Sequence, residues 1–187
     1  MPVVARLLRL FALMCGVALT IPFASSHAEE PPAADICREN PAFRAQDFTL
    51  GDWDVYAGET RIARVTLEPI LESCAIEETW TVTGGRTRGN GLGIFNYSAL
   101  LGHWMYHWVT DDGASTTFTG EPTGPGAIRY VTRKPLGEGP LGEKRVRLRH
   151  WTLTRTGDGG IRELSVGSED DGATWEVEYD LHWVPHT

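Results

Sequence analysis

The stretch HWMYHWVTDDGASTTFTG, residues 103–120, decides the fold because it predicts two strands joined by a tight turn. Every second residue in its first half is aromatic, so Trp104, Tyr106 and Trp108 share one face of an extended chain. The Asp-Gly pair that follows tolerates the positive φ angles of a tight hairpin. The stretch is therefore typical of a β-hairpin that buries an aromatic face.

The same pattern continues through most of the chain. From Asp47 onward, short segments rich in Val, Ile, Thr and aromatic residues alternate with turns that contain Gly, Asp or Pro. Long helical periodicity is absent, with at most one helical turn at residues 69–73. Strands are expected at residues 48–57, 61–69, 74–83, 91–98, 103–110, 114–120, 126–133, 143–155, 161–168 and 173–184. These strands predict an all-β fold, a single antiparallel up-and-down β-barrel of about 8–10 strands, because closure leaves no exposed sheet edge.

Two further segments place a charge beside a tryptophan on the face expected to point inward. Glu78 shares a face with Trp80 in CAIEETWTV, and Arg149 shares a face with Trp151 in RVRLRHWTLTR. A charge lies inside a barrel only if it is paired or if the interior is a wet cavity. We therefore expect Glu78 to pair with Arg149, with Arg147 and Arg162 as further partners. The cluster could orient a ligand or could be a structural ion pair, and the sequence favours neither.

Aromatic residues exceed what a small core requires, and their rings also stack on flat ligands. Most rings in a barrel of this size must fill space, but Trp80, Trp104, Trp108 and Trp151 are expected to line any cavity. The candidate ligand-binding residues are Glu78, Trp80, Tyr97, Trp104, Tyr106, Trp108, Arg149, Trp151 and Arg162.

The chain begins with features of an export signal. Arg6 and Arg9 precede an uncharged apolar run, and SHA ends at Ala28 with small residues at the positions that signal peptidase requires. Three parts are predicted: a signal peptide at 1–28, an N-terminal arm at 29–46 and a β-barrel domain at 47–187. The expected location is periplasmic or secreted.

Charge and cysteine content fit an exported protein. Removing the leader would lower the formal charge from −8 to −10, because the leader carries two arginines and no acidic residue. Nucleic acid is therefore not an expected partner, and no other apolar run is long enough for stable membrane insertion. Cys37 and Cys74 would remain, and an even pair in an oxidising compartment favours one disulfide over a catalytic thiol.

Five segments carry a resemblance to a known family: FTLGDWDVY, LESCAIEETWTV, GHWMYHWVTDDG, RHWTLTRTGDGGIRE and GSEDDGATWEVEYD. In this order they resemble a family of secreted bacterial lipocalin-like proteins of uncharacterised function, over residues 48–184. The resemblance implies a barrel akin to lipocalins, fatty-acid-binding proteins and the haem-binding nitrobindins. Gly51 and Trp53 resemble the G-x-W that opens a lipocalin barrel, where the Trp plugs the closed end. The chain departs from the family pattern at Ser73, Ser98, Tyr106 and Thr110.

The octapeptide SEDDGATW, residues 168–175, looks like the Asp-box of sialidases and other β-propellers. A propeller needs several blades with one repeat each, whereas this motif occurs once. Ser168 and Asp170 can bind turn amides, Gly172 supplies a permissive backbone, and Trp175 can pack beneath the hairpin. We interpret the motif as a structural clasp without a catalytic role.

Cofactor and enzyme motifs are weak in this sequence. His103 and His107 would lie about 13 Å apart along a strand, which is too far for two ligands of one metal ion. No metal and no cofactor is predicted, and haem is a minor alternative that would need an inward histidine. Neither a Gly-x-Ser-x-Gly motif nor a Walker loop occurs.

The leading hypothesis is therefore non-covalent binding of a small hydrophobic or amphipathic molecule. One alternative is an isomerase- or hydratase-type enzyme on the same barrel, with Glu78 as the acid–base group. Another is a filled barrel that acts through its outer surface as an envelope interaction protein. The sequence does not indicate an oligomeric state.

Overall fold

The computed structural model describes residues 33–85, 89–138, 142 and 144–187. The expected signal peptide at 1–28 lies outside these ranges. The strands are β1 (Gly51–Ala57), β2 (Thr60–Ile70), β3 (Ala75–Val82), β4 (Gly91–Ser98), β5 (His103–Thr110), β6 (Ser115–Gly124), β7 (Ala127–Glu138), β8 (Lys144–Arg155), β9 (Ile161–Ser168) and β10 (Glu176–Pro185). The helices are α1 (Ala33–Glu39) and α2 (Pro41–Arg44), with 3-10 turns η1 (Asp47–Thr49) and η2 (Leu71–Ser73). Among these described helices, none has the length and apolarity needed to cross a membrane.

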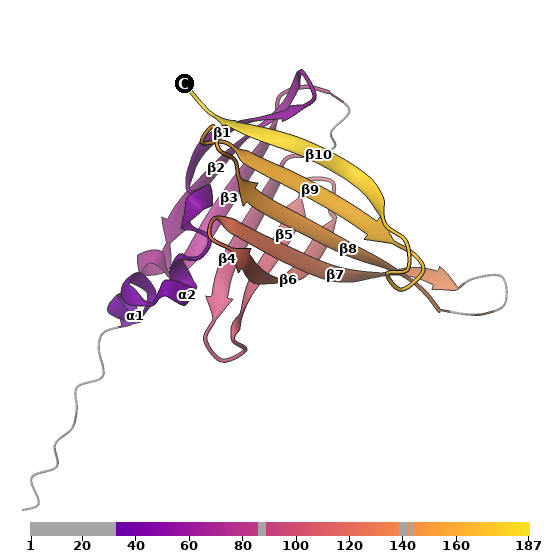
Figure 1. The fold of residues 1–187 in the computed structure, drawn as a ribbon, viewed down its shortest axis with the longest axis horizontal. Coiled ribbons are helices and arrows are strands. Elements are labelled where there is room, and N and C mark those ends of the chain that lie inside the picture. The colour runs from indigo at the N-terminus through magenta and orange to yellow at the C-terminus, as the bar shows by residue number, and fades with distance from the viewer. Residues whose placement is uncertain (1–32, 86–88, 139–141, 143) are drawn as a thin grey trace, which may run out of the picture. The chain divides into compact units, whose positions relative to one another are not determined.

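The strands form one closed barrel (Figure 1). Each strand pairs antiparallel with the next in sequence, and β1 pairs with β10 to complete the circle. The predicted all-β, up-and-down barrel is confirmed. β1 begins later than expected because residues 47–49 form η1, and β10 begins later because residues 169–175 form a turn.

The N-terminal arm contains short helices where the sequence shows no clear periodicity. Asn40 caps α2, since its side chain accepts a hydrogen bond from the Ala42 amide at 3.0 Å, and Pro41 fits the first helical turn. The predicted disulfide is present and links Cys37 of α1 to Cys74, which lies between η2 and β3. The helices are therefore fastened to the barrel end where β2 meets β3.

The arm closes that end of the barrel. Trp53 is buried and its indole Nε1 donates to the Thr49 carbonyl at 2.9 Å. Gly51 has a φ of 129°, a conformation that glycine adopts most readily. Trp104 on β5 donates to the Ala42 carbonyl of α2 at 3.1 Å. Figure 1 shows α1 and α2 at one end, with the β9–β10 connection at the other.

Candidate ligand-binding cavity

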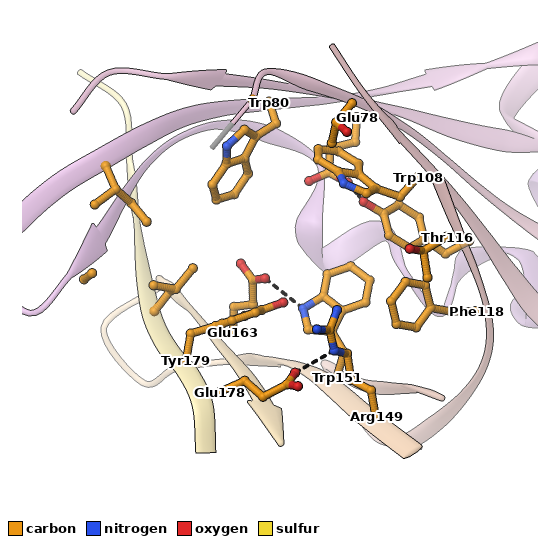
Figure 2. A pocket seen from close by; sticks show the side chains of 16 residues that line it. Glu78, Trp80, Trp108, Thr116, Phe118, Arg149, Trp151, Glu163, Glu178 and Tyr179 are labelled. Carbon is orange, nitrogen blue, oxygen red and sulfur yellow. Dashed lines mark hydrogen bonds and ion pairs between the residues drawn. The ribbon is translucent and has the colours of Figure 1, made fainter. Parts of the chain in front are cut away.

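A cavity of about 570 Å³ occupies the interior on the side away from the helices. It extends to Ala57, Gly89 and Thr110, which border the β1–β2, β3–β4 and β5–β6 turns, so it reaches the end of the barrel opposite α2. Six aromatic side chains and four ionisable ones line it (Figure 2). The aromatic members are Trp80, Tyr106, Trp108, Phe118, Trp151 and Tyr179, and the ionisable ones are Glu78, Arg149, Glu163 and Glu178.

Below the cavity the interior is packed solid with aromatic rings. Phe95 stacks on Tyr106 with ring centroids 4.1 Å apart, and Trp151 lies 4.8 Å from Tyr106 and 5.2 Å from Tyr130. Phe95 and Tyr130 are fully buried. The barrel is thus filled toward the helices and hollow toward the opposite end, so Tyr106 and Trp151 form the boundary between core and cavity.

Two glycines on β4 make room for the cavity wall. A Cβ at position 93 would lie 2.5 Å from the Tyr106 ring and 2.7 Å from Glu78 Oε2. A Cβ at position 91 would lie 2.1 Å from the Trp108 ring. A strand glycine often marks such a close approach. The sequence G-L-G at residues 91–93 was a signal for such an approach, but it does not identify the aromatic rings that pack against the two glycines.

Glu78 on β3 is buried deep in this cavity. Its side chain is 2 % exposed, and the Tyr106 hydroxyl donates to its Oε2 at 2.6 Å. Burial raises the pKa of Glu78 to about 8, because desolvation outweighs the opposing hydrogen bond from Tyr106 and the charge of Glu163 adds to the rise. The predicted pairing of Glu78 with Arg149 is wrong, and Glu78 is a neutral acid at pH 7.

Arg149 instead pairs with Glu178 on β10, with its Nε 2.5 Å from Oε2. Arg147 binds the other carboxylate oxygen at 2.7 Å, and the Ser165 hydroxyl donates to Oε2 at 2.8 Å. Burial raises the pKa of Glu178, but the bonds from Ser165 and Arg147 and the charge of Arg149 outweigh it, so the net shift is downward. Glu178 is therefore ionised at pH 7.

A bulge explains why Glu178 escaped prediction from alternation. The pairing of β10 with β9 shifts between Val177 and Tyr179. Strict alternation would send Glu178 and Tyr179 to opposite faces, but both line the cavity. No feature of EVEYD marks that shift, so the sequence alone could not assign this partner to Arg149.

Glu163 on β9 is the second buried acid and was also missed. It is 5 % exposed, and the indole Nε1 atoms of Trp151 and Trp183 donate to its two oxygens, each at 2.8 Å. Burial raises the pKa of Glu163 to about 7 against the opposing hydrogen bonds of Trp183, Trp151 and Tyr179. Glu163 lies two residues after the buried Ile161 on the same strand, and this spacing could have predicted that it points inward. β9 lacks the tryptophan that drew attention to the other strands.

Three predicted ligand-binding residues lie outside the cavity wall. Arg162, next to Glu163, points outward and pairs with Asp180 at 2.7 Å, so its predicted place inside the barrel is wrong. Trp104 is buried against α2 rather than beside the cavity. Tyr97 meets the edge of the Phe43 ring at 5.1 Å. Trp104 and Tyr97 therefore belong to the closed end, whereas Glu78, Trp80, Tyr106, Trp108, Arg149 and Trp151 do line the cavity.

The SEDDGATW turn forms a hydrogen-bonded clasp between β9 and β10. The Ser168 hydroxyl accepts from the Gly172 amide at 2.8 Å, and Asp170 accepts from the Thr174 amide at 2.9 Å. The bonds from Thr174 and Ser168 lower the pKa of Asp170 to about 2. Gly172 has a φ of 92°, and Trp175 packs on the His150 ring at 4.2 Å. These contacts are local and structural.

Metal-ligating side chains do not gather in the described ranges, where no group of three or more His, Cys, Asp or Glu residues could hold a metal ion. His107 faces outward beside Thr117, with Nδ1 3.3 Å from Oγ1. Neither His103 nor His107 contributes to the cavity wall.

Fold and site together define a closed antiparallel barrel with a one-ended, aromatic and acid-containing cavity. No family model and no curated protein matches the chain. Any inference about the function of the protein must therefore rest on the chemistry of the cavity.

Proposed function

We propose that the protein is an exported lipocalin-like barrel that binds a small, mainly apolar ligand without covalent chemistry. The cavity of about 570 Å³ carries this proposal. Sites for small molecules are typically concave, roughly 300–1,000 Å³ in volume, and lined by apolar and aromatic groups with few polar ones. The aromatic wall around Glu78 and Glu163 has this composition.

The polar end of the ligand would meet the Glu78–Tyr106 pair. Glu78 is buried and Oε2 is occupied by the Tyr106 hydroxyl, which leaves the second oxygen for a ligand. A protonated carboxyl can both donate and accept hydrogen bonds. Arg149 and Glu178 form a separate ion pair, so Glu78 and Arg149 do not form the joint anchor that was expected from the sequence.

A periplasmic or secreted location is part of the proposal. The disulfide between Cys37 and Cys74 favours an oxidising compartment. The apolar run before Ala28 favours export for an independent reason. Membership of the lipocalin-like family named above stays a proposal of the same kind, supported by the barrel and by the Gly51–Trp53 opening.

A second candidate is an acid–base enzyme, which the raised pKa of Glu78 favours. A buried carboxyl with a pKa of about 8 can hold a proton at pH 7 and exchange it with a bound substrate. In this candidate Glu78 would move a proton while Tyr106 orients its carboxyl. Proton exchange at a ligand carbon, measured in D₂O and lost in Glu78→Gln, would distinguish the enzyme from a simple binder.

The binding proposal is tested with the apolar fluorescent probe N-phenyl-1-naphthylamine. Thr116 on β6 lines the cavity, and the adjacent Thr117 is exposed on the outer face. Thr116→Trp should fill the cavity and weaken probe binding at least ten-fold, whereas the matched control Thr117→Trp should bind like the wild type. Absence of binding to the wild-type protein, or equal binding by both variants, would contradict a ligand cavity.

A further inference from the structure

The two deepest acids of the cavity have no cationic partner within the described ranges of the chain. Arg149 is engaged by Glu178, and Arg147 is shared between Glu178 and Glu169. The hydrogen-bond partners of Glu78 and Glu163 are neutral phenol and indole groups. The arginines near the cavity are therefore paired with Glu178 and Glu169, and in the described part of the chain none forms an ion pair with the two deeper acids.

Glu78 and Glu163 face the same space from separate walls. Glu78 lies on β3 and Glu163 on β9, which are four places apart around the ten-strand barrel. Figure 2 shows them on opposite sides of the cavity. They are close enough for the charge of Glu163 to raise the pKa of Glu78. A ligand between them would contact both carboxyls.

Aromatic faces surround this space. Trp80, Trp108 and Trp151 all line the cavity, and Figure 2 shows Trp80 and Trp108 on the side of Glu78, with Trp151 next to Glu163. The negative face of an indole ring attracts a cation, most strongly where water is excluded. Carboxyls and indole rings thus favour the same type of ligand group.

We propose that the ligand is an organic cation, an amine on an apolar body, whose charged end lies between Glu78 and Glu163. This inference rests on the proposed binding function and names its ligand class. Once ionised, the same two acids would repel an anionic end group, and Arg149, which lines the cavity, already pairs with Glu178. A buried carboxylate and a bound ammonium would neutralise each other.

Proton linkage follows from this arrangement. The other titratable groups around the two acids are Tyr106 on β5, Tyr130 on β7, Arg147 and Arg149 on β8, and Glu178 and Tyr179 on β10. The three tyrosines have pKa values well above 10 because they are buried, and the pKa of Glu178 is lowered. Between pH 6 and 9 the cavity therefore gains negative charge as Glu78 and Glu163 ionise. Because a bound ammonium group favours the ionised carboxylates, amine binding should release protons from those that are still protonated.

The test compares three probes with one apolar body: 4-phenylbutylamine, 4-phenylbutanol and 4-phenylbutyrate. Calorimetric titrations at pH 6.0 and 8.5, in buffers of different ionisation enthalpy, give both affinity and protons released. We expect the amine to bind at least ten-fold tighter than the alcohol at pH 8.5, where both acids are largely ionised. At pH 6.0 the amine should be bound several-fold less selectively, and its binding should release protons. The butyrate should bind most weakly.

Conservative variants assign the effect to the two acids. Glu78→Gln and Glu163→Gln should each reduce the ratio of amine to alcohol affinity several-fold, while the alcohol itself reports an intact cavity. Glu77→Gln is the matched control, because Glu77 lies beside Glu78 on the outward face of β3. This control should keep the wild-type ratio.

The outcomes separate this inference from the binding proposal. If the alcohol or the butyrate binds the wild-type protein as tightly as the amine, the cation inference is overturned and the binding proposal stands. If none of the three probes binds, and N-phenyl-1-naphthylamine also fails, both are overturned. Amine selectivity that survives in both glutamine variants would also refute the assignment to Glu78 and Glu163.

Discussion

Replacing Glu78 by glutamine should stabilise the protein, and the gain should grow with pH. The folded protein holds the Glu78 proton with a pKa of about 8, whereas the unfolded chain releases it at the usual 4.5. A group whose folded pKa is raised binds more protons in the folded than in the unfolded state. The contribution of Glu78 to stability is therefore most favourable below pH 4.5 and is lost as the pH rises through 8.

The magnitude follows from the size of the shift. Each pKa unit corresponds to about 1.4 kcal/mol, so ionisable Glu78 costs the fold about 1 kcal/mol at pH 5, about 3 at pH 7 and up to about 5 above pH 8. Glutamine keeps the shape and an oxygen for the Tyr106 hydroxyl, but it cannot ionise. The free energy of unfolding of Glu78→Gln should exceed that of the wild type by roughly 3–4 kcal/mol more at pH 9 than at pH 5.

The assay is urea unfolding at pH 5, 7 and 9, followed by tryptophan fluorescence with the disulfide intact. Glu77→Gln serves as the control and should follow the wild type at each pH. A difference between Glu78→Gln and wild type that stays constant from pH 5 to 9 would refute the reasoning. Glu163→Gln should behave similarly with its midpoint near pH 7, and the double variant should gain less than the sum because the two charges repel each other.

Two further variants test packing and covalent closure. Gly93→Ala places a methyl group against the Tyr106 ring, so it should cost about 1–3 kcal/mol of unfolding free energy and weaken probe binding. Gly157→Ala is the control, because a methyl group there would lie in open space and should change neither stability nor probe binding. Equal losses of stability in the two variants would contradict the close approach at position 93. Replacing both Cys37 and Cys74 by alanine should cost about 3–4 kcal/mol in urea unfolding, because the bridge spans 37 residues. A loss below about 1 kcal/mol would show that the arm is held by its hydrogen bonds instead.

The strand pattern was predictable from the sequence because alternation is a local property. Trp80, Tyr106 and Trp151 point inward as their period-two spacing predicts. The arm was not predictable in the same way, since α1 and α2 have seven and four residues and are too short to show helical periodicity. Their capping residue Asn40 and the following Pro41 were the signals present.

Charge partners inside the barrel were less predictable, because they depend on closure and on one bulge. Arg149 and Glu78 lie on strands far apart around the barrel, whereas Glu178 is two strands from Arg149. The bulge in β10 then turns Glu178 toward the interior. Neither property is encoded in the alternation of a single segment. The prediction paired Arg149 with Glu78 because both side chains were expected to point inward, but the true partner is Glu178.

The most direct test of the account is the titration of the Glu78 carboxyl carbon by ¹³C NMR, in the free protein and with saturating 4-phenylbutylamine. The account predicts a midpoint near pH 8 in the free protein, and a midpoint at least one unit lower when the amine occupies the cavity and stabilises the carboxylate. A free-protein midpoint near 4.5, or a midpoint that does not move in the saturated protein, would contradict it.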